Sequence, residues 1–269
     1  MYHIVASDLD GTLLNSEHQL SAFTKQVLQA LRQRDIHFIF ATGRHHIDVE
    51  QMRENMDIDA YMITSNGARV HNSKGELILS KNIATDIVPA IVSIAQDNPY
   101  VYTHVYCGDN WLINKEDSYS LSFFQESNFT YQLFEPMNCP VNDIAKIYFT
   151  TSDDKYNQEL IAIQHQLVDL FGDKISIAFS TLNCLEIMAA GVNKGSALAY
   201  IVNKLGYKLE QCIAFGDGMN DYEMLTTVGK GCVMKNAPQI VKDHLPNIEV
   251  IGANSDDAVP HYLQTLLLK

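Results

Sequence analysis

The chain has 269 residues, of which 46% are hydrophobic and 19% are charged, so it can bury the core of one large domain or two modest ones. Its net charge is −13, from 19 Lys and Arg against 32 Asp and Glu, and the cations form no cluster. This balance argues against a nucleic-acid-binding protein, because affinity for a phosphate backbone depends on clustered Lys and Arg.

The first predicted strand, Tyr2 to Ala6, runs directly into the sequence Asp8-Leu9-Asp10-Gly11-Thr12-Leu13. The strand residues are mostly apolar or β-branched and Gly11 ends the run, so two carboxylates are delivered at the end of a buried strand. In an open α/β sheet this end faces the ligand crevice. Two carboxylates so close together favour a bound cation, and Mg²⁺ commonly binds through carboxylates and a substrate phosphate. A solvated Asp-Gly turn is the alternative interpretation.

The next elements continue an alternation of strands and helices, which predicts a doubly wound, Rossmann-like parallel sheet. They are a helix from Leu20 to Arg34, a strand from Ile36 to Ala41, a helix from Asp48 to Met56 and a strand from Tyr61 to Thr64. Thr42-Gly43-Arg44 follows the second strand, and Ser65-Asn66-Gly67 follows the third. Arg69 to His71 and Leu77 to Leu79 then predict a hairpin.

The composition changes between about Asn82 and Leu185, where ten aromatic residues lie between Tyr100 and Phe134. We predict an inserted α/β cap domain over residues 83–185, between the two parts of a catalytic core, 1–82 and 186–269. Ala145 to Thr150 and Ile175 to Ser180 are its predicted strands, with a helix from Asn157 to Leu170 between them. Thr103, His104 and Tyr106 alternate along a further possible strand, where they could face a leaving group, although ordinary sheet packing is the expected role.

After the insertion the chain returns to the first pattern, and further polar residues follow the predicted elements. These elements are a helix from Lys194 to Lys204, strands from Gln211 to Phe215 and Gly231 to Met234, a helix from Ala237 to Lys242, a strand from Glu249 to Ile251 and a helix from Val259 to Leu268. Gly216-Asp217-Gly218-Met219-Asn220-Asp221 follows the first of these strands. Together with Asp8, Asp10 and Thr42, these residues supply what phosphoryl transfer requires: a nucleophile, an acid or base, and donors that neutralise charge.

This set of motifs resembles the haloacid dehalogenase superfamily of aspartate-nucleophile phosphatases, in its Cof-type branch with a large α/β cap. The resemblance rests on Asp8 to Thr12, Thr42 to Arg44, Ser65 to Gly67, Asn193 to Gly195 and Gly216 to Asp221. It spans the whole chain, because the insertion falls where that branch carries its cap. Within this branch the chain resembles the enterobacterial members that act on sugar phosphates and pyridoxal phosphate.

The resemblance implies a role for each matched residue. Asp8 would be the nucleophile that forms an aspartyl-phosphate, and Asp10 would protonate the leaving group and then deprotonate water. Asp8 and Asp217 would bind Mg²⁺ by carboxylate and Asp10 by its backbone carbonyl, with Asp221 orienting a metal-bound water or Lys194. The residues expected to hold the phosphate are Thr42, Lys194, Asn220 and the amides of Leu9 and Gly43.

Other functions and sites remain open at this point. A phosphomutase or phosphotransferase would use the same aspartyl-phosphate, and a non-catalytic phospholigand sensor would use the same pocket. A dehalogenase would not need Asp217, and an ion-pumping ATPase would need membrane spans. His45 and His46 are adjacent, so they lack the i, i+4 spacing of a helical metal pair, and their role is left undecided.

The remaining features predict a cytoplasmic protein, and the resemblance implies a small phosphorylated metabolite as its partner. The five cysteines show no ligand spacing, which is typical of reduced thiols. No apolar run reaches the ~20 residues that span a bilayer, and the chain enters its first strand at once, without a signal segment. The sequence makes no prediction of oligomeric state.

Overall fold

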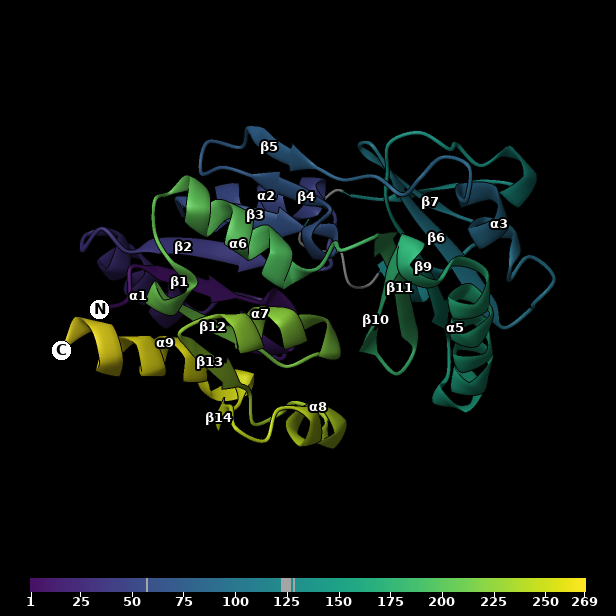
Figure 1. The fold of residues 1–269 in the computed structure, drawn as a ribbon. Coiled ribbons are helices and arrows are strands. Elements are labelled where there is room, and N and C mark those ends of the chain that lie inside the picture. The colour runs from purple at the N-terminus through teal and green to yellow at the C-terminus, as the bar shows by residue number, and fades with distance from the viewer. Residues whose placement is uncertain (57, 122–126, 128) are drawn as a thin grey trace.

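The structure is a computed structural model that describes residues 1–56, 58–121, 127 and 129–269. Figure 1 shows a larger lobe, which carries both termini, and a smaller lobe, with two chain segments passing between them. The strands of the larger lobe are β1 (Ile4–Ser7), β2 (His37–Ala41), β3 (Ala60–Thr64), β4 (Arg69–His71), β5 (Leu77–Ser80), β12 (Cys212–Gly216), β13 (Lys230–Val233) and β14 (Glu249–Val250). They form one sheet in the order β14-β13-β12-β1-β2-β3-β4-β5.

Six of these strands are parallel, and the β4–β5 hairpin adds an antiparallel edge. From β1 the chain winds outward through β2 and β3 on one side, and β12 and β13 continue on the other side, so the winding reverses at β1. Ligands of open α/β sheets bind outside the carboxyl ends of the strands at such a reversal. The predicted doubly wound α/β fold is confirmed, and its central strands β12, β1 and β2 are the ones that lead into the polar motifs.

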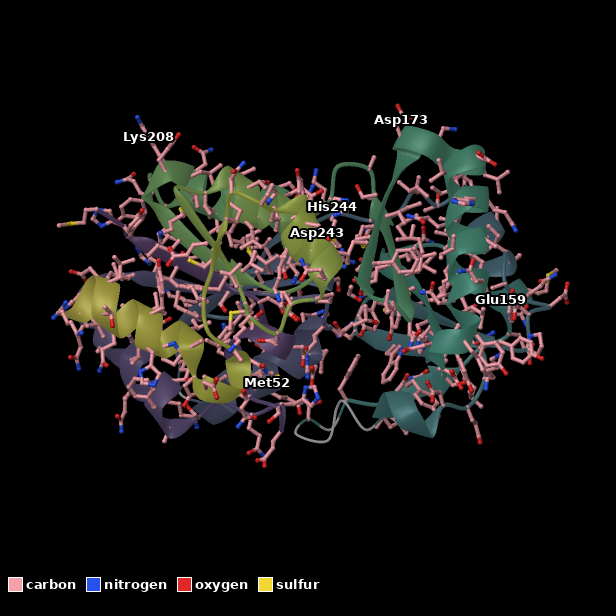
Figure 2. The ribbon with its side chains drawn as sticks, turned by 90° about the horizontal axis from the view of Figure 1, so that it is seen from below. Met52, Glu159, Asp173, Lys208, Asp243 and His244 are labelled. Atoms are coloured by element: carbon pink, nitrogen blue, oxygen red, sulfur yellow. The ribbon has the colours of Figure 1, made fainter. Side chains whose placement is uncertain are left out.

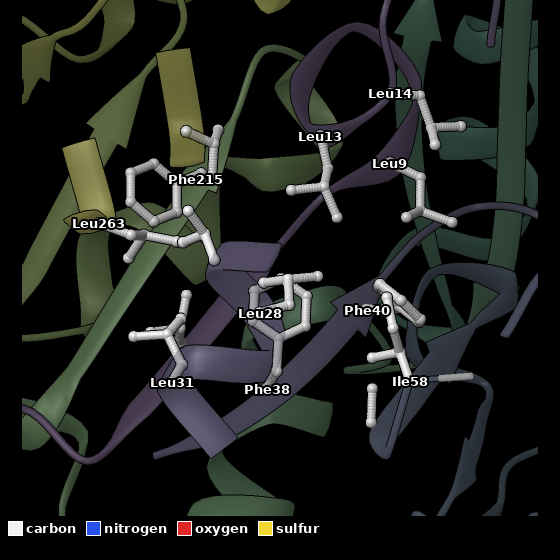
Figure 3. Packing of buried hydrophobic residues seen from close by; sticks show 14 of the residues in the cluster. Leu9, Leu13, Leu14, Leu28, Leu31, Phe38, Phe40, Ile58, Phe215 and Leu263 are labelled. Carbon is white, nitrogen blue, oxygen red and sulfur yellow. The ribbon is translucent and has the colours of Figure 1, made fainter. Parts of the chain in front are cut away.

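Helices cover both faces of this sheet, because successive strand residues point to opposite sides. In β1, Val5 packs in a cluster with residues of α1 (Ala22–Arg32), α2 (His46–Met56) and α9 (Ala258–Leu263). Ile4 and Ala6 pack on the opposite face, against α6 (Lys194–Lys204), α7 (Tyr222–Thr227) and α8 (Gln239–His244). Figure 3 shows that Leu9 and Leu13, in the loop after β1, belong to the first cluster, so apolar contacts anchor that loop.

The smaller lobe has a six-stranded sheet in the order β10-β11-β9-β6-β7-β8. Its elements are α3 (Val88–Ser93), β6 (Val101–Cys107), β7 (Asn110–Ile113), α4 (Ser118–Leu121), β8 (Tyr131–Leu133), β9 (Ile144–Thr151), α5 (Asn157–Phe171), β10 (Ile175–Thr181) and β11 (Cys184–Ala189). Odd-numbered residues such as Ile147, Phe149 and Leu185 pack against α3 and α5. Figure 2, turned from the first view, shows α5 with Glu159 on the side of this lobe away from the larger lobe, and Asp173 at one end of the lobe, just after α5.

The even-numbered residues of the same strands form the opposite side of this sheet, which we call the inner face. It comprises Tyr106 of β6, Lys146, Tyr148 and Thr150 of β9, and Cys184 and Glu186 of β11, all of which line a cavity shared with the larger lobe. The two faces therefore differ in character, with apolar side chains toward the helices and polar or aromatic side chains toward the larger lobe.

The predicted elements of the larger lobe match the structure, except that α7 was not predicted. In the smaller lobe the predicted strands within 144–151 and 175–181 and the helix between them are present, and β6 covers the possible strand at Thr103 to Tyr106. The elements α3, α4, β7, β8 and β11 were not predicted. The predicted domain boundary at residue 185 falls inside β11, which pairs with β9 and β10. Glu186 interrupts the apolar run of β11, which hid that strand in the sequence. In the described part of the chain no helix combines the length and the apolar character that crossing a membrane would need.

Candidate active site

The loop after β1 presents Asp8 at the carboxyl end of the central strand. The amide of Asp8 donates to the carbonyl of Phe215 on β12 at 3.0 Å, so the parallel pairing continues up to the site. Gly11 has a φ of +74°, and a Cβ there would lie 2.3 Å from Oδ2 of Asp217. Glycine is therefore required both by the left-handed backbone and by the close approach of the second carboxylate. Asp8 itself is buried.

Lys194 bridges the carboxylates of Asp8 and Asp221. Its Nζ donates to Oδ1 of Asp8 at 2.7 Å and to Oδ1 of Asp221 at 2.6 Å. The lysine is the first residue of α6, whose start is fixed by Asn193, which accepts a hydrogen bond from the amide of Ser196. Burial alone would lower the pKa of Lys194, but Asp221 and Asp8 together raise it above its usual value. Lys194 therefore remains an ammonium ion.

Asp8, Asp217 and Asp221 form a carboxylate cluster with too little positive charge around it. One oxygen from each lies within 4.8 Å of the others, and Lys194 is the cation that contacts two of them. Burial and the neighbouring carboxylates raise the pKa of Asp8 well above its usual value, against the effect of Lys194. Burial and the charge of Asp221 raise the pKa of Asp217 to about 7. The cluster therefore favours either a proton or a cation.

The hydrogen-bond donors around these carboxylates distinguish Asp8 and Asp217, which are candidate metal ligands, from Asp221, whose two oxygens are already hydrogen-bonded. Asp221 accepts from Lys194 through Oδ1 and from the amides of Asp217 and Gly218 through Oδ2. Asp217 accepts from the hydroxyl of Thr12 through Oδ1 at 2.9 Å. Among the described residues, none donates to Oδ2 of Asp8 or to Oδ2 of Asp217. Two carboxylate oxygens open to a hard cation fit Mg²⁺, which takes one or two protein carboxylates and fills its other positions with water and phosphate.

Asp10 lies apart from the carboxylate cluster. Its two oxygens accept from Nε and Nη2 of Arg44, both at 2.7 Å, and Oδ1 also lies 3.0 Å from Nδ1 of His18. Arg44 is held in turn by Asp48 at 2.8 Å. Burial would raise the pKa of Asp10, but Arg44 outweighs it and holds that pKa well below its usual range. The sequence did not predict this pairing, and the proposed metal contact through the carbonyl of Asp10 stays a prediction.

The predicted catalytic residues and three of the predicted phosphate-binding residues line one cavity of about 560 Å³ between the lobes. Asp8, Asp10 and Asp217 lie on the larger lobe together with Thr42, Gly43 and Asn220, and the inner face of the smaller lobe lies opposite. Leu9 and Lys194 are buried and do not line this cavity, so Lys194 reaches the site only through Asp8 and Asp221. The cavity is the place where a small phosphorylated molecule could meet both lobes.

A larger cavity, about 840 Å³, also lies between the lobes but is lined by many apolar residues, among them Ile161, Phe179 and Ile240. Gly218 and Asn220 line both cavities, and Asn66 lines the larger one. None of the predicted catalytic carboxylates lines the larger cavity. The positions of Asp8, Asp10 and Asp217 favour the smaller cavity as the reaction site.

The histidines that the sequence left undecided lie outside the cavity. His45 and His46 contact the carbonyl of Gly108 and the carboxylate of Asp109, both at 3.0 Å, where the larger lobe meets the β6–β7 turn. His104 is buried: Nε1 of Trp111 donates to its Nδ1, so its Nε2 carries the proton and donates to Thr150. Of the residues singled out on that strand, Tyr106 lines the cavity and His104 supports a residue that does.

Mg²⁺ affinity is expected to depend on pH because metal ligands must be deprotonated. The pKa of Asp217 is about 7, so below that pH a proton competes with the ion, and the affinity should fall roughly tenfold per pH unit. Above that pH the affinity should level off. Calorimetric titration with Mg²⁺ between about pH 5.5 and pH 8.5 measures this profile. An affinity that does not change over this range would contradict Asp217 as a ligand. Asp217→Asn should weaken Mg²⁺ binding and leave only the pH dependence that Asp8 contributes.

Comparison with known proteins gives consistent results over the whole chain. A family model for haloacid dehalogenase-like hydrolases matches residues 5–263. A Buchnera aphidicola protein is 37% identical over 269 residues, 100% of both chains. An Escherichia coli protein named HMP-PP phosphatase is 38% identical over 263 residues, which are 98% of this chain and 95% of that protein. The solved structure of a haloacid dehalogenase-like hydrolase from B. subtilis has a TM-score of 0.87 at 26% identity and covers 98% of this chain and 100% of its own.

Proposed function

The chain belongs to the haloacid dehalogenase-like hydrolase family, and from that premise we propose that it is a Mg²⁺-dependent phosphatase of small phosphorylated metabolites that acts through an aspartyl-phosphate. The observation that carries the proposal is the buried arrangement of Asp8, Lys194 and Asp221 beside Asp217, at the edge of a cavity between the lobes. A carboxylate nucleophile needs no base to activate it, because a carboxyl group is ordinarily ionised at neutral pH, and cations beside Asp8 favour that ionised form.

In the first half of the proposed reaction, an oxygen of Asp8 attacks the phosphorus and the bond to the leaving oxygen breaks. Lys194 fixes the other oxygen of Asp8 at 2.7 Å and so orients the nucleophile. Asp10 gives its proton to the leaving alkoxide. Asp10 is held as a carboxylate by Arg44, and the negative charge of a bound phosphate would raise its pKa toward the protonated form.

In the second half, water attacks the phosphorus of the aspartyl-phosphate, Asp10 takes its proton, and the bond between phosphorus and Asp8 breaks to release inorganic phosphate. Thr42, Asn220 and the amides of Leu9 and Gly43 would donate to the phosphate oxygens in both halves. Asp8 and Asp217 would hold Mg²⁺ by carboxylate and Asp10 by its carbonyl. When bound, Mg²⁺ would neutralise the charge of the phosphate and of the carboxylate cluster.

The size of the cavity and the net charge of the chain support a small phosphorylated molecule as the substrate. The smaller lobe would act as the cap domain, ending after β11, and a cavity of about 560 Å³ between two lobes would exclude polymers. A net charge of −13 would also disfavour polyanions. Sugar phosphates, pyridoxal 5′-phosphate and HMP-PP, which the name of the Escherichia coli relative specifies, are the first compounds to test.

Phosphate release from a panel of substrates tests the proposal. We expect kcat/KM to be highest for a sugar phosphate, pyridoxal 5′-phosphate or HMP-PP, and far lower for a phosphopeptide or ATP. One inorganic phosphate released per substrate consumed, with no new phosphorylated product, would distinguish hydrolysis from phosphoryl transfer. A phosphopeptide or ATP as the best substrate would contradict the assignment of the smaller lobe as a lid for small molecules.

A further inference from the structure

Two ionised side chains of the smaller lobe are buried and meet the larger lobe at the proposed phosphate site. Lys146 on β9 and Glu186 on β11 are 2% and 3% exposed, and Nζ of Lys146 lies 2.6 Å from Oε1 of Glu186. Buried charges are costly unless each is paired and hydrogen-bonded. Neither residue has a part in the proposed chemistry, so the presence of this pair on the inner face needs another reason.

The pair is bonded to two loops of the larger lobe. Lys146 donates to the carbonyl of Gly43 at 2.6 Å, and Glu186 accepts from Nδ2 of Asn66 at 2.8 Å through its second oxygen. Asn66 in turn accepts from Nδ2 of Asn220 through its own carbonyl oxygen at 3.2 Å. A continuous chain of hydrogen bonds therefore runs from Gly43 through the buried pair to Asn220.

Both ends of this chain are residues proposed to hold the phosphate. A Cβ on Gly43 would lie 3.1 Å from Asn66, 3.2 Å from Glu186 and 3.4 Å from Lys146, so this loop has little room to move while the pair is in place. Asn66 has a φ of +55°, a left-handed conformation that Asn tolerates better than most residues and that costs free energy unless its surroundings fix it. The bond to Glu186 is one of the contacts that fix it.

We propose that Lys146 and Glu186 are positioning residues, which order Gly43 and Asn220 for phosphate binding when the smaller lobe lies against the larger one. A phosphate site is effective when its donors are held in place before the ligand arrives, because binding then costs less ordering. The pair supplies this order from the smaller lobe. Phosphate affinity is thereby linked to the position of that lobe, without either residue contacting the phosphate. The inference rests on the proposed phosphate site.

The test compares the binding of inorganic phosphate by calorimetry, in the presence of Mg²⁺, for the wild type and the double variant Lys146→Met/Glu186→Leu. Removing both charges together avoids an unpaired charge in the interior. We expect the dissociation constant for phosphate to rise about tenfold or more, with a matching rise in KM for substrate and an unfolding midpoint close to that of the wild type. Unchanged phosphate affinity in the folded double variant would overturn the proposal.

Two further variants keep the test decisive. In Asn66→Gly, glycine tolerates the left-handed backbone and introduces no charge, but the side chain that links Glu186 to Asn220 is lost. This variant should therefore also weaken phosphate binding. Asp143→Asn is the matched control, because Asp143 pairs with Arg69 of the larger lobe at 2.6 Å away from the cavity, and it should bind phosphate like the wild type. A loss in Asp143→Asn equal to that of the double variant would show a general effect of lobe contacts and would overturn the specific role.

Binding is measured without turnover, so this proposal and the proposed function can fail separately. A wild-type protein that binds phosphate but hydrolyses no compound of the panel would reject the proposed function. A tenfold loss of phosphate affinity in the double variant would still support the positioning role in that case.

Discussion

Replacing Asp8 by Asn is expected to lower kcat by at least roughly 10⁴-fold, because the variant lacks the nucleophile and an amide oxygen is a poor substitute. The fold should persist: the side chain keeps its shape, and its amide oxygen can still accept from Lys194, which lies 2.7 Å from Oδ1. Removing a negative charge also relieves repulsion among the three neighbouring carboxylates, of which those of Asp8 and Asp221 are buried. Steady-state kinetics measures the loss, and circular dichroism and thermal unfolding check the fold.

The matched control is Asp173→Asn, since Asp173 is an exposed aspartate at one end of the smaller lobe and does not line the cavity (Figure 2). It should leave kcat unchanged. Trapping with BeF₃⁻, which imitates a phosphoryl group on a carboxylate, should label the wild type and not Asp8→Asn. Substantial turnover by Asp8→Asn would contradict covalent catalysis at this position.

Removing divalent metal is expected to reduce turnover to a few per cent or less, and added Mg²⁺ should restore it. Without a metal ion, an incoming phosphate dianion would meet the carboxylates of Asp8, Asp217 and Asp221. Among the described residues, Lys194 is the one cation that pairs with two of them. Like charges this close repel strongly in a buried site, so both binding and attack would be suppressed. Assays after dialysis against EDTA, followed by titration with Mg²⁺, measure the effect.

Calcium provides the control for the geometry of the metal site. Ca²⁺ prefers more oxygen ligands at longer distances than the octahedral Mg²⁺, so it should bind without restoring full turnover. Asp217→Asn should raise the Mg²⁺ concentration required for activity. Full activity in metal-free protein would contradict the assignment of Asp8 and Asp217 as ligands.

The convergence of the site could be predicted because it follows from topology. Asp8, Thr42 and Asp217 each follow a buried strand, and the carboxyl ends of adjacent parallel strands meet at one edge of the sheet. Hydrophobic runs ended by Gly11, Gly43 and Gly216 were enough to find those ends. The family resemblance added the roles, which the experiments above would test.

The pairing of Asp10 with Arg44 could not be predicted in the same way. Both residues were in recognised motifs, but the orientation of a side chain depends on neighbours such as His18 and Asp48, which the topology alone does not place. Sequence reasoning also expects charged residues at the surface. Lys146 and Glu186 depart from that expectation because they pair with each other, although they lie 40 positions apart in the sequence. The charged residue Glu186 within an otherwise apolar run is also the reason why β11 was not predicted.

The alternation along β6, β9 and β11 has a consequence for how such proteins diverge over time. Ile147, Phe149 and their odd-numbered neighbours pack against α3 and α5, so a substitution there would destabilise the packing of the smaller lobe. Tyr148, Thr150 and Cys184 face the cavity, so exchanging them alters the surface presented to a bound molecule while the helices stay packed behind it. A few substitutions at alternate positions of these strands could thus change which leaving group the protein accepts, while the residues that carry out the reaction stay the same.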